Sequence, residues 1–373
     1  MLAACVEGDP VRRADPDMSQ SDVALTRGGA PVEFDRPSCG SFANDHRLAI
    51  CEGAERQIIA FDSAGQYQFA FGRRGAGPGE FHTIVGVHFD RRGTLLAWDG
   101  GRHKMVAIDD AGRLVQDTRF AELSGWLPRY LGQTDGGQFL FLDRTAFVPR
   151  ARARAGLVQQ WSRLIVFDSS SRQVSDVDSI VLSEAFAHGD GFQRVTFGFP
   201  FAAAGDAVVA GEKLVWAFSR DSVAHMHDPL TGRIDTLPLS LPAFRVDDAD
   251  WEERWDTIVA RSASEFRDRV RAAKSNVPRV QEHPRFLRLM STPRGTVAAY
   301  APSDTSRLTY VVQCIVVAPG DVCPAVRTVP GEVVIAVTSG RAAVGIDQED
   351  GTWRVVLRPA RAPNMRSGLR AQK

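Results

Sequence analysis

Two histidines on one predicted strand are the first candidates for chemistry in this sequence. His225 and His227 lie two residues apart in the apolar run that begins at Val223, so on a strand both side chains point to one face. Paired histidines on a strand face form half of a common transition-metal site. The sequence places no further His, Asp or Glu beside them. We therefore favour structural histidines, with a bound divalent cation as the alternative.

Four cysteines could form disulfides, and four cysteines allow three pairings. Sequence proximity favours Cys39 with Cys51 and Cys314 with Cys323. The second pair flanks a predicted hairpin, where a bridge is geometrically reasonable. The alternative is four free thiols packed as small apolar side chains. No spacing is CxxC or CxxxC, so a zinc site is not predicted.

The sequence contains none of the common hydrolase and nucleotide-binding motifs, namely GxSxG, HExxH and GxxxxGK[ST]. The loop from Gly72 to Gly79 is rich in glycine and carries Arg73 and Arg74, so it could cradle a phosphate. Phosphate loops of that kind lead into a helix, however, and this one leads into a strand. We expect Glu80 to hold backbone amides of the loop by hydrogen bonds.

A second basic feature lies in a predicted insertion. Arg150, Arg152 and Arg154 alternate with alanine and would share one face of an extended chain. An acidic ligand is one interpretation, and a solvated loop is the one we favour.

The sequence predicts strands and turns most clearly between Phe71 and Gly112, and such elements must position the residues described above. Apolar runs predict strands at Ile84–Phe89, Thr94–Trp98 and Lys104–Ile108, with a fourth starting at Arg113. The turns between them contain Asp followed by Gly, which can take a positive φ. Four short strands with turns about every 8–12 residues are typical of one propeller blade.

This stretch resembles the NHL-type blade of six-bladed β-propellers. The similarity rests on F-G-x-x-G-x-G-P-G-E-F, on D-x-x-G-x-L, and on the later D-x-x-G turn, all in order between Phe71 and Gly112. Elsewhere in the chain it is fainter. The resemblance implies an all-β, six-bladed β-propeller of four-stranded antiparallel blades. It does not imply one function, because propellers host many.

Fainter units predict the other five blades. They span 47–71, 129–171 with an insertion at 144–160, 201–232, 286–320 and 332–357. We expect Val23–Thr26 to complete the last blade and close the ring, with Val32–Phe34 as a second candidate. The candidate inner strands Ile84–Phe89, Phe201–Ala203 and Phe286–Met290 are mostly apolar.

A helical insertion is predicted from Asp247 to Lys274. Apolar residues there recur at steps of three and four, acids favour its start, and Pro278 follows its end. Its apolar positions are Trp251, Trp255, Ile258, Val259, Phe266 and Val270. We expect the helix to pack over one mouth of the propeller, with both tryptophans in the core.

The first residues, Met1-Leu2-Ala3-Ala4-Cys5, resemble the lipobox of bacterial lipoproteins, where the cysteine becomes the acylated first residue. A complete signal also has a basic and an apolar region upstream, and we expect both regions to precede Met1 in a longer chain. Chance is the alternative. If the lipobox interpretation is right, residues 1–20 are the lipoprotein-type N-terminus with a flexible polar tether. We expect residues 21–359 to form the propeller and residues 360–373 to form a basic disordered tail.

Composition narrows the class of partner. Among 373 residues, 45 basic and 45 acidic side chains balance, which argues against nucleic acid as the main partner. No run of 18 or more apolar residues occurs. We expect a monomer that contacts membrane only through a lipid anchor.

Two functional hypotheses follow. The first is a lipid-anchored propeller of the bacterial cell envelope, periplasmic or surface-facing, that binds a protein, peptide or glycan at one mouth. The second is a metal-dependent propeller hydrolase or lyase with its site in the central channel. An enzyme needs three or more convergent carboxylates, Asn or His at one mouth, whereas a binding module needs an apolar patch with a polar rim. The apolar inner strands favour the binding module, and the sequence names no catalytic residue.

Overall fold

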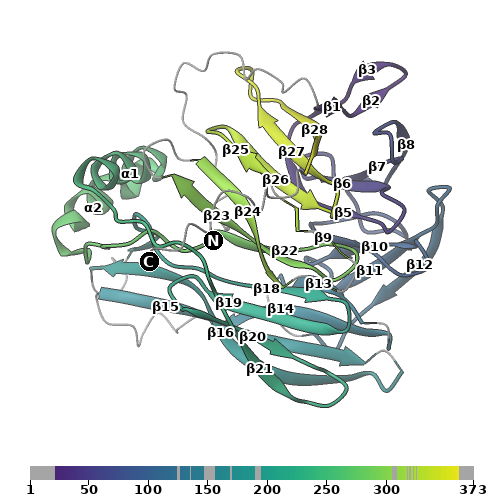
Figure 1. Cartoon of the computed structure of the whole chain (residues 1–373), viewed down its shortest axis with the longest axis horizontal. Helices are drawn as coiled ribbons and strands as arrows, with labels where there is room; N and C mark the ends of the chain where they lie inside the picture. Colours follow the sequence, from purple (N-terminus) through teal and green to yellow (C-terminus); the bar gives the residue numbers. More distant parts are fainter. Residues whose placement is uncertain are drawn as a thin grey trace, which may run out of the picture.

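The computed structural model describes residues 22–123, 127–134, 136–146, 156–168, 170–189, 195–304, 309–316, 318, 321, 323–324 and 326–360. Within these residues the chain forms six antiparallel sheets of four or five strands and one short hairpin (Figure 1). The first strands of the six sheets contact one another in cyclic order, so the sheets are the blades of a β-propeller. The all-β prediction of four-stranded antiparallel blades is confirmed.

The strands follow one another along the chain, blade by blade. Blade one has β5 (Pro37–Phe42), β6 (Leu48–Glu52), β7 (Gln57–Phe61) and β8 (Tyr67–Phe71), and blade two has β9 (Ile84–Phe89), β10 (Leu95–Asp99), β11 (Lys104–Ile108) and β12 (Leu114–Arg119). Blade three has β13 (Arg129–Gln133), β14 (Gln138–Ala146), β15 (Gly156–Asp168), β16 (Gln173–His188) and β17 (Val195–Phe197), and blade four has β18 (Gly205–Ala210), β19 (Lys213–Phe218), β20 (Val223–His227) and β21 (Ile234–Pro238). Blade five has β22 (Arg288–Ser291), β23 (Val297–Asp304), β24 (Thr309–Val316) and β25 (Arg327–Thr328), and blade six has β26 (Glu332–Val337), β27 (Arg341–Asp347) and β28 (Trp353–Pro359).

Strands from the start of the described chain complete blade six. Both predicted candidates take part, because β1 (Val23–Ala24) and β4 (Glu33–Phe34) each pair with β28. Between them, β2 (Thr26–Arg27) and β3 (Ala30–Pro31) form the hairpin. The first and last segments therefore share one sheet, which closes the ring and removes its open edge.

Aspartates build the tight turns at one end of the blades. In the turns that begin at Asp62, Asp90 and Asp109, the carboxylate accepts hydrogen bonds from the amides two and four residues later. Gly112 closes the last of these turns with a φ of +75°. A Cβ at Gly112 would lie 2.6 Å from Phe69 Cγ of blade one, so the turn requires glycine on two counts. We call this end of the propeller the turn face.

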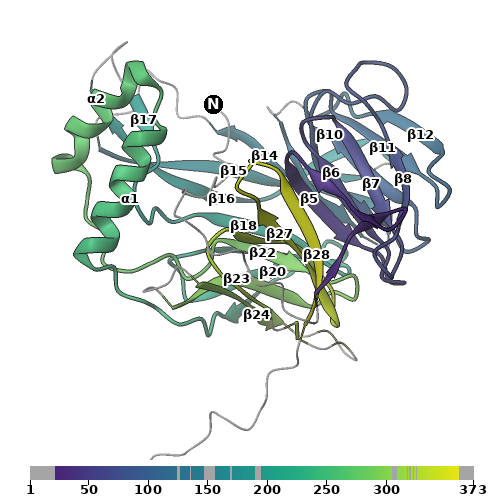
Figure 2. The ribbon, with the colours of Figure 1, turned by 90° about the horizontal axis from the view of Figure 1, so that it is seen from above.

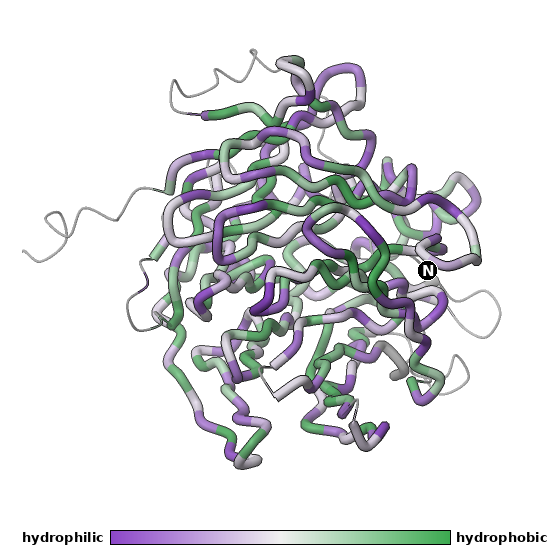
Figure 3. The backbone as a smooth tube through the Cα atoms, turned by 90° about the vertical axis from the view of Figure 1, so that its right-hand side faces the viewer, coloured by the Kyte–Doolittle hydropathy of each residue, from purple (hydrophilic) through white to green (hydrophobic). Residues whose placement is uncertain are grey.

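The core lies between adjacent blades. Strands β6, β10 and β11 are buried at every position, because neighbouring strands flank them and other blades cover both faces. Their sequences accordingly show near-continuous apolar runs with little alternation. The hydropathy colouring places most apolar segments inside and polar turns outside (Figure 3).

The prediction assigned the wrong segment as the inner strand of blade four. Phe201–Ala203 is a turn and not the inner strand, and Phe201 has a φ of +56°. The predicted Gly205-Asp206 turn is instead the start of the inner strand β18. Strand β5 was not predicted, because its residues have little apolar character. Strand β22 begins two residues later than the predicted strand Phe286–Met290.

The predicted single helix is two helices, α1 (Asp248–Arg261) and α2 (Ser264–Ala273), followed by a short 3-10 turn, η2 (Lys274–Asn276). Ser262 and Ala263 are extended and break the helix. Asp247 caps α1 by accepting from the amide of Asp250. Both tryptophans are buried, as predicted, and Phe266 is left partly exposed because α2 starts a new helical phase.

The helices pack on blade three and not centrally over a mouth. Trp251, Trp255 and Val270 share a cluster with Phe186 of β16 and Phe197 of β17. Strands β15 and β16 are far longer than those of other blades and carry this cluster outward. Figure 2 shows the helices on the side of the molecule opposite blades one and two.

Two disulfides occur within the described residues. Cys39 and Cys51 face each other on the paired strands β5 and β6. Cys314, on β24, is bonded to Cys323. This pairing is the one that sequence proximity favours among the three alternatives.

Candidate binding site

The channel wall contains charged residues that the apolar interpretation of the inner strands did not include. Arg129, Asp206 and Arg288 come from the first strands of blades three, four and five. Arg129 forms an ion pair with Asp206 and donates to the carbonyl of Ala207 at 3.0 Å. Asp206 also accepts from the amide of Leu289 at 2.7 Å, next to Arg288. One carboxylate thus joins three consecutive blades.

Arg288 extends the same network to blade six. Its two terminal nitrogens donate to the carbonyls of Val334 and Ile335, at 3.3 and 3.2 Å. Burial lowers the pKa of Arg288, while Asp206 partly opposes that change. The inner strand is the edge of each blade, so its outward carbonyls need donors. Arg129 and Arg288 donate hydrogen bonds to these strand-edge carbonyls. This structural role explains why charged side chains lie in the channel wall, without a substrate to bind them.

Buried carboxylates at the opposite end of the blades also hold the backbone. Glu52 accepts from the amides of Asp35, Arg36 and Ala54. In blade two, the carboxylate of Asp99 accepts hydrogen bonds from the amides of His82, Thr83 and Gly101. In both blades the second strand ends in an acid that fixes the loop leading into the first strand. These oxygens are occupied, so they do not serve as the convergent carboxylates that an enzyme would need.

The candidate metal histidines do not lie on a strand that lines the channel. His225 and His227 are on β20, the third strand of blade four, and His225 stacks on Trp216 with ring centroids 5.4 Å apart. His227 is buried, and burial lowers its pKa. Among the residues that the structure describes, no three His, Cys, Asp or Glu side chains gather as metal ligands would.

The glycine-rich loop is held by its own side chains. Glu80 accepts from the amide of Gly77 at 2.8 Å and pairs with Arg73, so the predicted role of Glu80 is confirmed. Lys104 donates to the carbonyls of Gly77 and Glu80 and forms an ion pair with Asp117. The loop therefore uses its donors and acceptors to fix blade two.

A cleft of about 310 Å³ opens between blades one and two on the turn face, and we call it the interblade cleft. Five apolar side chains line it: Phe69 is partly exposed, and Ala60, Phe61, Phe89 and Leu95 are buried beneath the cleft surface. Asp45, Arg47, Asp109 and Asp110 form its charged rim. This volume is at the lower end of the range of about 300–1,000 Å³ found for ligand sites. It combines an apolar patch with a polar rim, as a binding site does.

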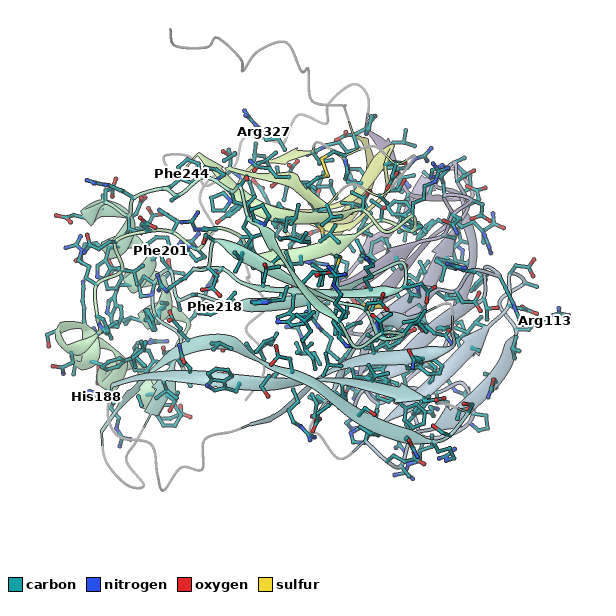
Figure 4. The ribbon with its side chains drawn as sticks, turned by 60° about the horizontal axis from the view of Figure 1, so that its bottom comes forward. Arg113, His188, Phe201, Phe218, Phe244 and Arg327 are labelled. Carbon is teal, nitrogen blue, oxygen red and sulfur yellow. A yellow bond between two sulfur atoms is a disulfide. The ribbon has the colours of Figure 1, made fainter. Side chains whose placement is uncertain are left out.

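The charged side chains of the rim differ in how many ion pairs and other contacts they make within the protein. Arg47 pairs with Asp45 at 2.8 Å and lies over the Phe89 ring, 5.4 Å from its centroid. Asp109 pairs with Arg113, and hydrogen bonds from Arg113 lower the pKa of Asp109. Arg113 projects at the outer edge of blade two, away from His188 and Phe201 near the helices (Figure 4). The hydrogen bond to Asp109 and, to a smaller extent, the charge of Asp110 raise the pKa of Arg113, so the exposed carboxylate of Asp110 also interacts with a cation of this chain.

His88 offers a measurable test of the packing between blades two and three. Its ring lies edge-on to Tyr130, with centroids 6.3 Å apart. Burial lowers the pKa of His88 to about 4, although Asp90 acts in the opposite direction. Below its ordinary value of 6.5, the unfolded chain therefore binds the proton more readily than the folded chain.

We expect the free energy of unfolding to fall by roughly 2–3 kcal/mol through this group as the pH falls from 6.5 to 4. Urea unfolding of the wild type and of His88→Leu across that range would measure it. The difference between the two proteins isolates His88, since His227 and the carboxylates titrate in both. Parallel stability curves would show that His88 does not titrate in this way.

Several predicted features lie outside the described residues. These are Cys5 with the N-terminal tether, Arg150, Arg152 and Arg154, and most of the basic tail. No helix in the described part of the chain is long and apolar enough to cross a membrane.

Solved structures with low sequence identity share the fold. A protein described as exported, from Bacteroides fragilis, aligns with a TM-score of 0.51 and 11% identity over 92% of this chain and 94% of that one. A member of the DUF4221 family from Bacteroides vulgatus aligns with a TM-score of 0.50 and 10% identity over 90% and 95% of the two chains. Virginiamycin B lyase from Staphylococcus aureus reaches only 0.41 at 7% identity, over 90% and 98%. No family profile and no curated protein matches the sequence, so the resemblance to NHL-type blades stays a prediction.

Proposed function

We propose that this chain is a binding module of the bacterial cell envelope, held at a membrane by an acylated Cys5. Its ligand is a protein, peptide or glycan that docks on the turn face at the interblade cleft. The observation that carries the proposal is the cleft itself, with its apolar floor and charged rim.

The polar groups of the channel wall do not favour a catalytic site there. Its charged residues are engaged with one another and with strand edges, and the buried acids Glu52 and Asp99 hold backbone amides. Strained or unengaged polar groups converging on one point would favour an enzyme. The interblade cleft differs, because apolar side chains line much of it and the carboxylate of Asp110 is exposed to solvent.

The envelope location has three supports. The sequence Leu2-Ala3-Ala4-Cys5 resembles a lipobox. Two disulfides suit an oxidising compartment. One structure that shares the fold is described as exported. Intact-mass analysis of the membrane fraction tests the anchor: we expect Cys5 to carry lipid, and an unmodified cysteine would remove the anchor from the proposal.

Site-specific photo-crosslinking in the source cell tests the binding function. A photoreactive amino acid replaces Gln68, an exposed residue that lines the cleft. We expect a discrete adduct whose mass tells protein, peptide and glycan apart. Leu230, exposed on an outer turn of blade four, is the matched control position and should give none.

Loss of the adduct in Ala60→Leu, which adds bulk to the cleft floor, would locate the binding in the cleft. An adduct that forms equally at Leu230, or that persists in Ala60→Leu, would overturn the assignment.

A further inference from the structure

We propose that the interblade cleft takes a lysine or arginine side chain from an extended segment of a partner protein. The inference rests on the proposed function and names the chemistry of the ligand. It comes from three features of the cleft: its apolar depth, the charge of its rim, and a cation already packed against its wall.

The apolar depth suits a long aliphatic stem. Ala60 faces Phe69 across the paired strands β7 and β8, and its small side chain leaves space that a larger residue would fill. Leu95 and Phe89 close the side toward blade two. Lysine and arginine bury their methylene stems on such surfaces while the charged head stays at the rim.

The rim has the complementary charge. Three carboxylates and one guanidinium line it, and the guanidinium of Arg47 is already paired with Asp45. Asp109 is engaged by Arg113. Asp110 is exposed at the outer end of the cleft and shares the charge of Arg113 with Asp109, so three carboxylates face two guanidiniums. A cation is therefore the charge that this rim favours, and an anion would meet an acidic rim.

The chain's own Arg47 shows the same chemistry at the inner end of the cleft. Its guanidinium lies over the Phe89 ring beside the carboxylate of Asp45. Phe69 and Asp110 supply another ring and another carboxylate to the lining of the same cleft. Gly112 fixes their relation, because only a residue without a Cβ lets this turn lie directly on Phe69.

The test is a titration of the full chain with short blocked peptides, followed by methyl NMR of Leu95. The probes are acetyl-Leu-Lys-Leu-amide, its arginine analogue, its glutamate analogue and its norleucine analogue, which keeps the stem without the charge. We expect the lysine and arginine peptides to bind at least tenfold more tightly than the norleucine peptide. The glutamate peptide should bind most weakly.

Two variants locate the effect. Asp110→Lys should weaken binding of the lysine peptide at least tenfold, and Ala60→Leu should abolish the Leu95 shifts for every peptide. Glu349→Lys makes the same charge change on an exposed outer turn of blade six and should alter affinity less than twofold. Thermal melts of all three variants establish that they fold.

The outcomes separate this inference from the proposed function. If the norleucine peptide binds as well as the lysine peptide and Asp110→Lys has no effect, the cationic ligand is wrong, although the cleft still binds. If no peptide shifts Leu95 while the adduct at Gln68 forms, the ligand class is wrong and the binding function stands. If both fail, both proposals are overturned.

Discussion

Replacing Asp206 with alanine should lower the free energy of unfolding by about 3–5 kcal/mol, the range for removing one partner of a buried ion pair. The carboxylate accepts from Arg129, from the amide of Ala207 and from the amide of Leu289. Without it, two guanidiniums, those of Arg129 and Arg288, share the channel with no carboxylate between them. The two amides also lose their acceptor, which adds a desolvation penalty.

Chemical denaturation followed by tryptophan fluorescence measures this loss. Asp206→Asn keeps an acceptor and removes the charge, so its loss should be smaller than that of alanine. Asp110→Ala is the control for removing an acid from an exposed turn, and it should change stability by less than about 0.5 kcal/mol. A loss below about 1 kcal/mol for Asp206→Ala would show that the ion pair and the cross-blade bond contribute little.

Replacing Arg358 with methionine should cost a similar amount, about 3–5 kcal/mol. Arg358 pairs with Asp22 at 2.9 Å and with Glu332 at 2.8 Å, and both carboxylates are almost wholly buried. The hydrogen bonds to Glu332 raise the pKa of Arg358 above its ordinary value, despite the opposing effect of burial. Methionine keeps most of the stem and leaves the two carboxylates without their cation.

The effect should be concentrated where the ring closes, since Asp22 precedes β1 and Arg358 lies on β28. We expect limited proteolysis to cut before β5 much faster in the variant than in the wild type. Arg113→Met removes an exposed ion pair with Asp109 and serves as the control, which should leave stability almost unchanged because solvent screens that pair. Unchanged stability and cleavage in Arg358→Met would mean that strand pairing alone closes the ring.

Blade two shows how much of the fold local sequence can predict. The sequence predicts its strands almost residue by residue, because apolar runs of about five residues alternate with turns that begin with Asp and end with Gly. Asp90 and Asp109 bond to amides within four residues, so these turns are specified by neighbours in sequence. Turns of this kind can therefore be predicted from a short stretch of sequence, without knowledge of the rest of the chain.

Blade four shows where this reasoning ends. Gly205-Asp206 has the composition of a turn, yet it begins β18, because Asp206 finds its partners on β13 and β22. The signal that could have found it is a lone acid in an otherwise apolar inner strand. Sequence order cannot show which distant strand supplies the donor. The break at Ser262–Ala263 escapes prediction for a related reason, since packing of α2 against blade three accompanies it.

The sequence by itself determined the class of structure, the strands and turns of its best blade and the role of Glu80. It favoured the disulfide pairing that the structure has, but it left free thiols as an alternative. Each depends on residues close together in the chain. The tertiary structure alone decided the charged network in the channel, the joint closure of blade six by β1 and β4, and the interblade cleft. These depend on which strands become neighbours: the cleft is lined by Ala60 of blade one together with Leu95 and Asp110 of blade two. Packing between blades sets that relation, and no local pattern in the sequence contains it.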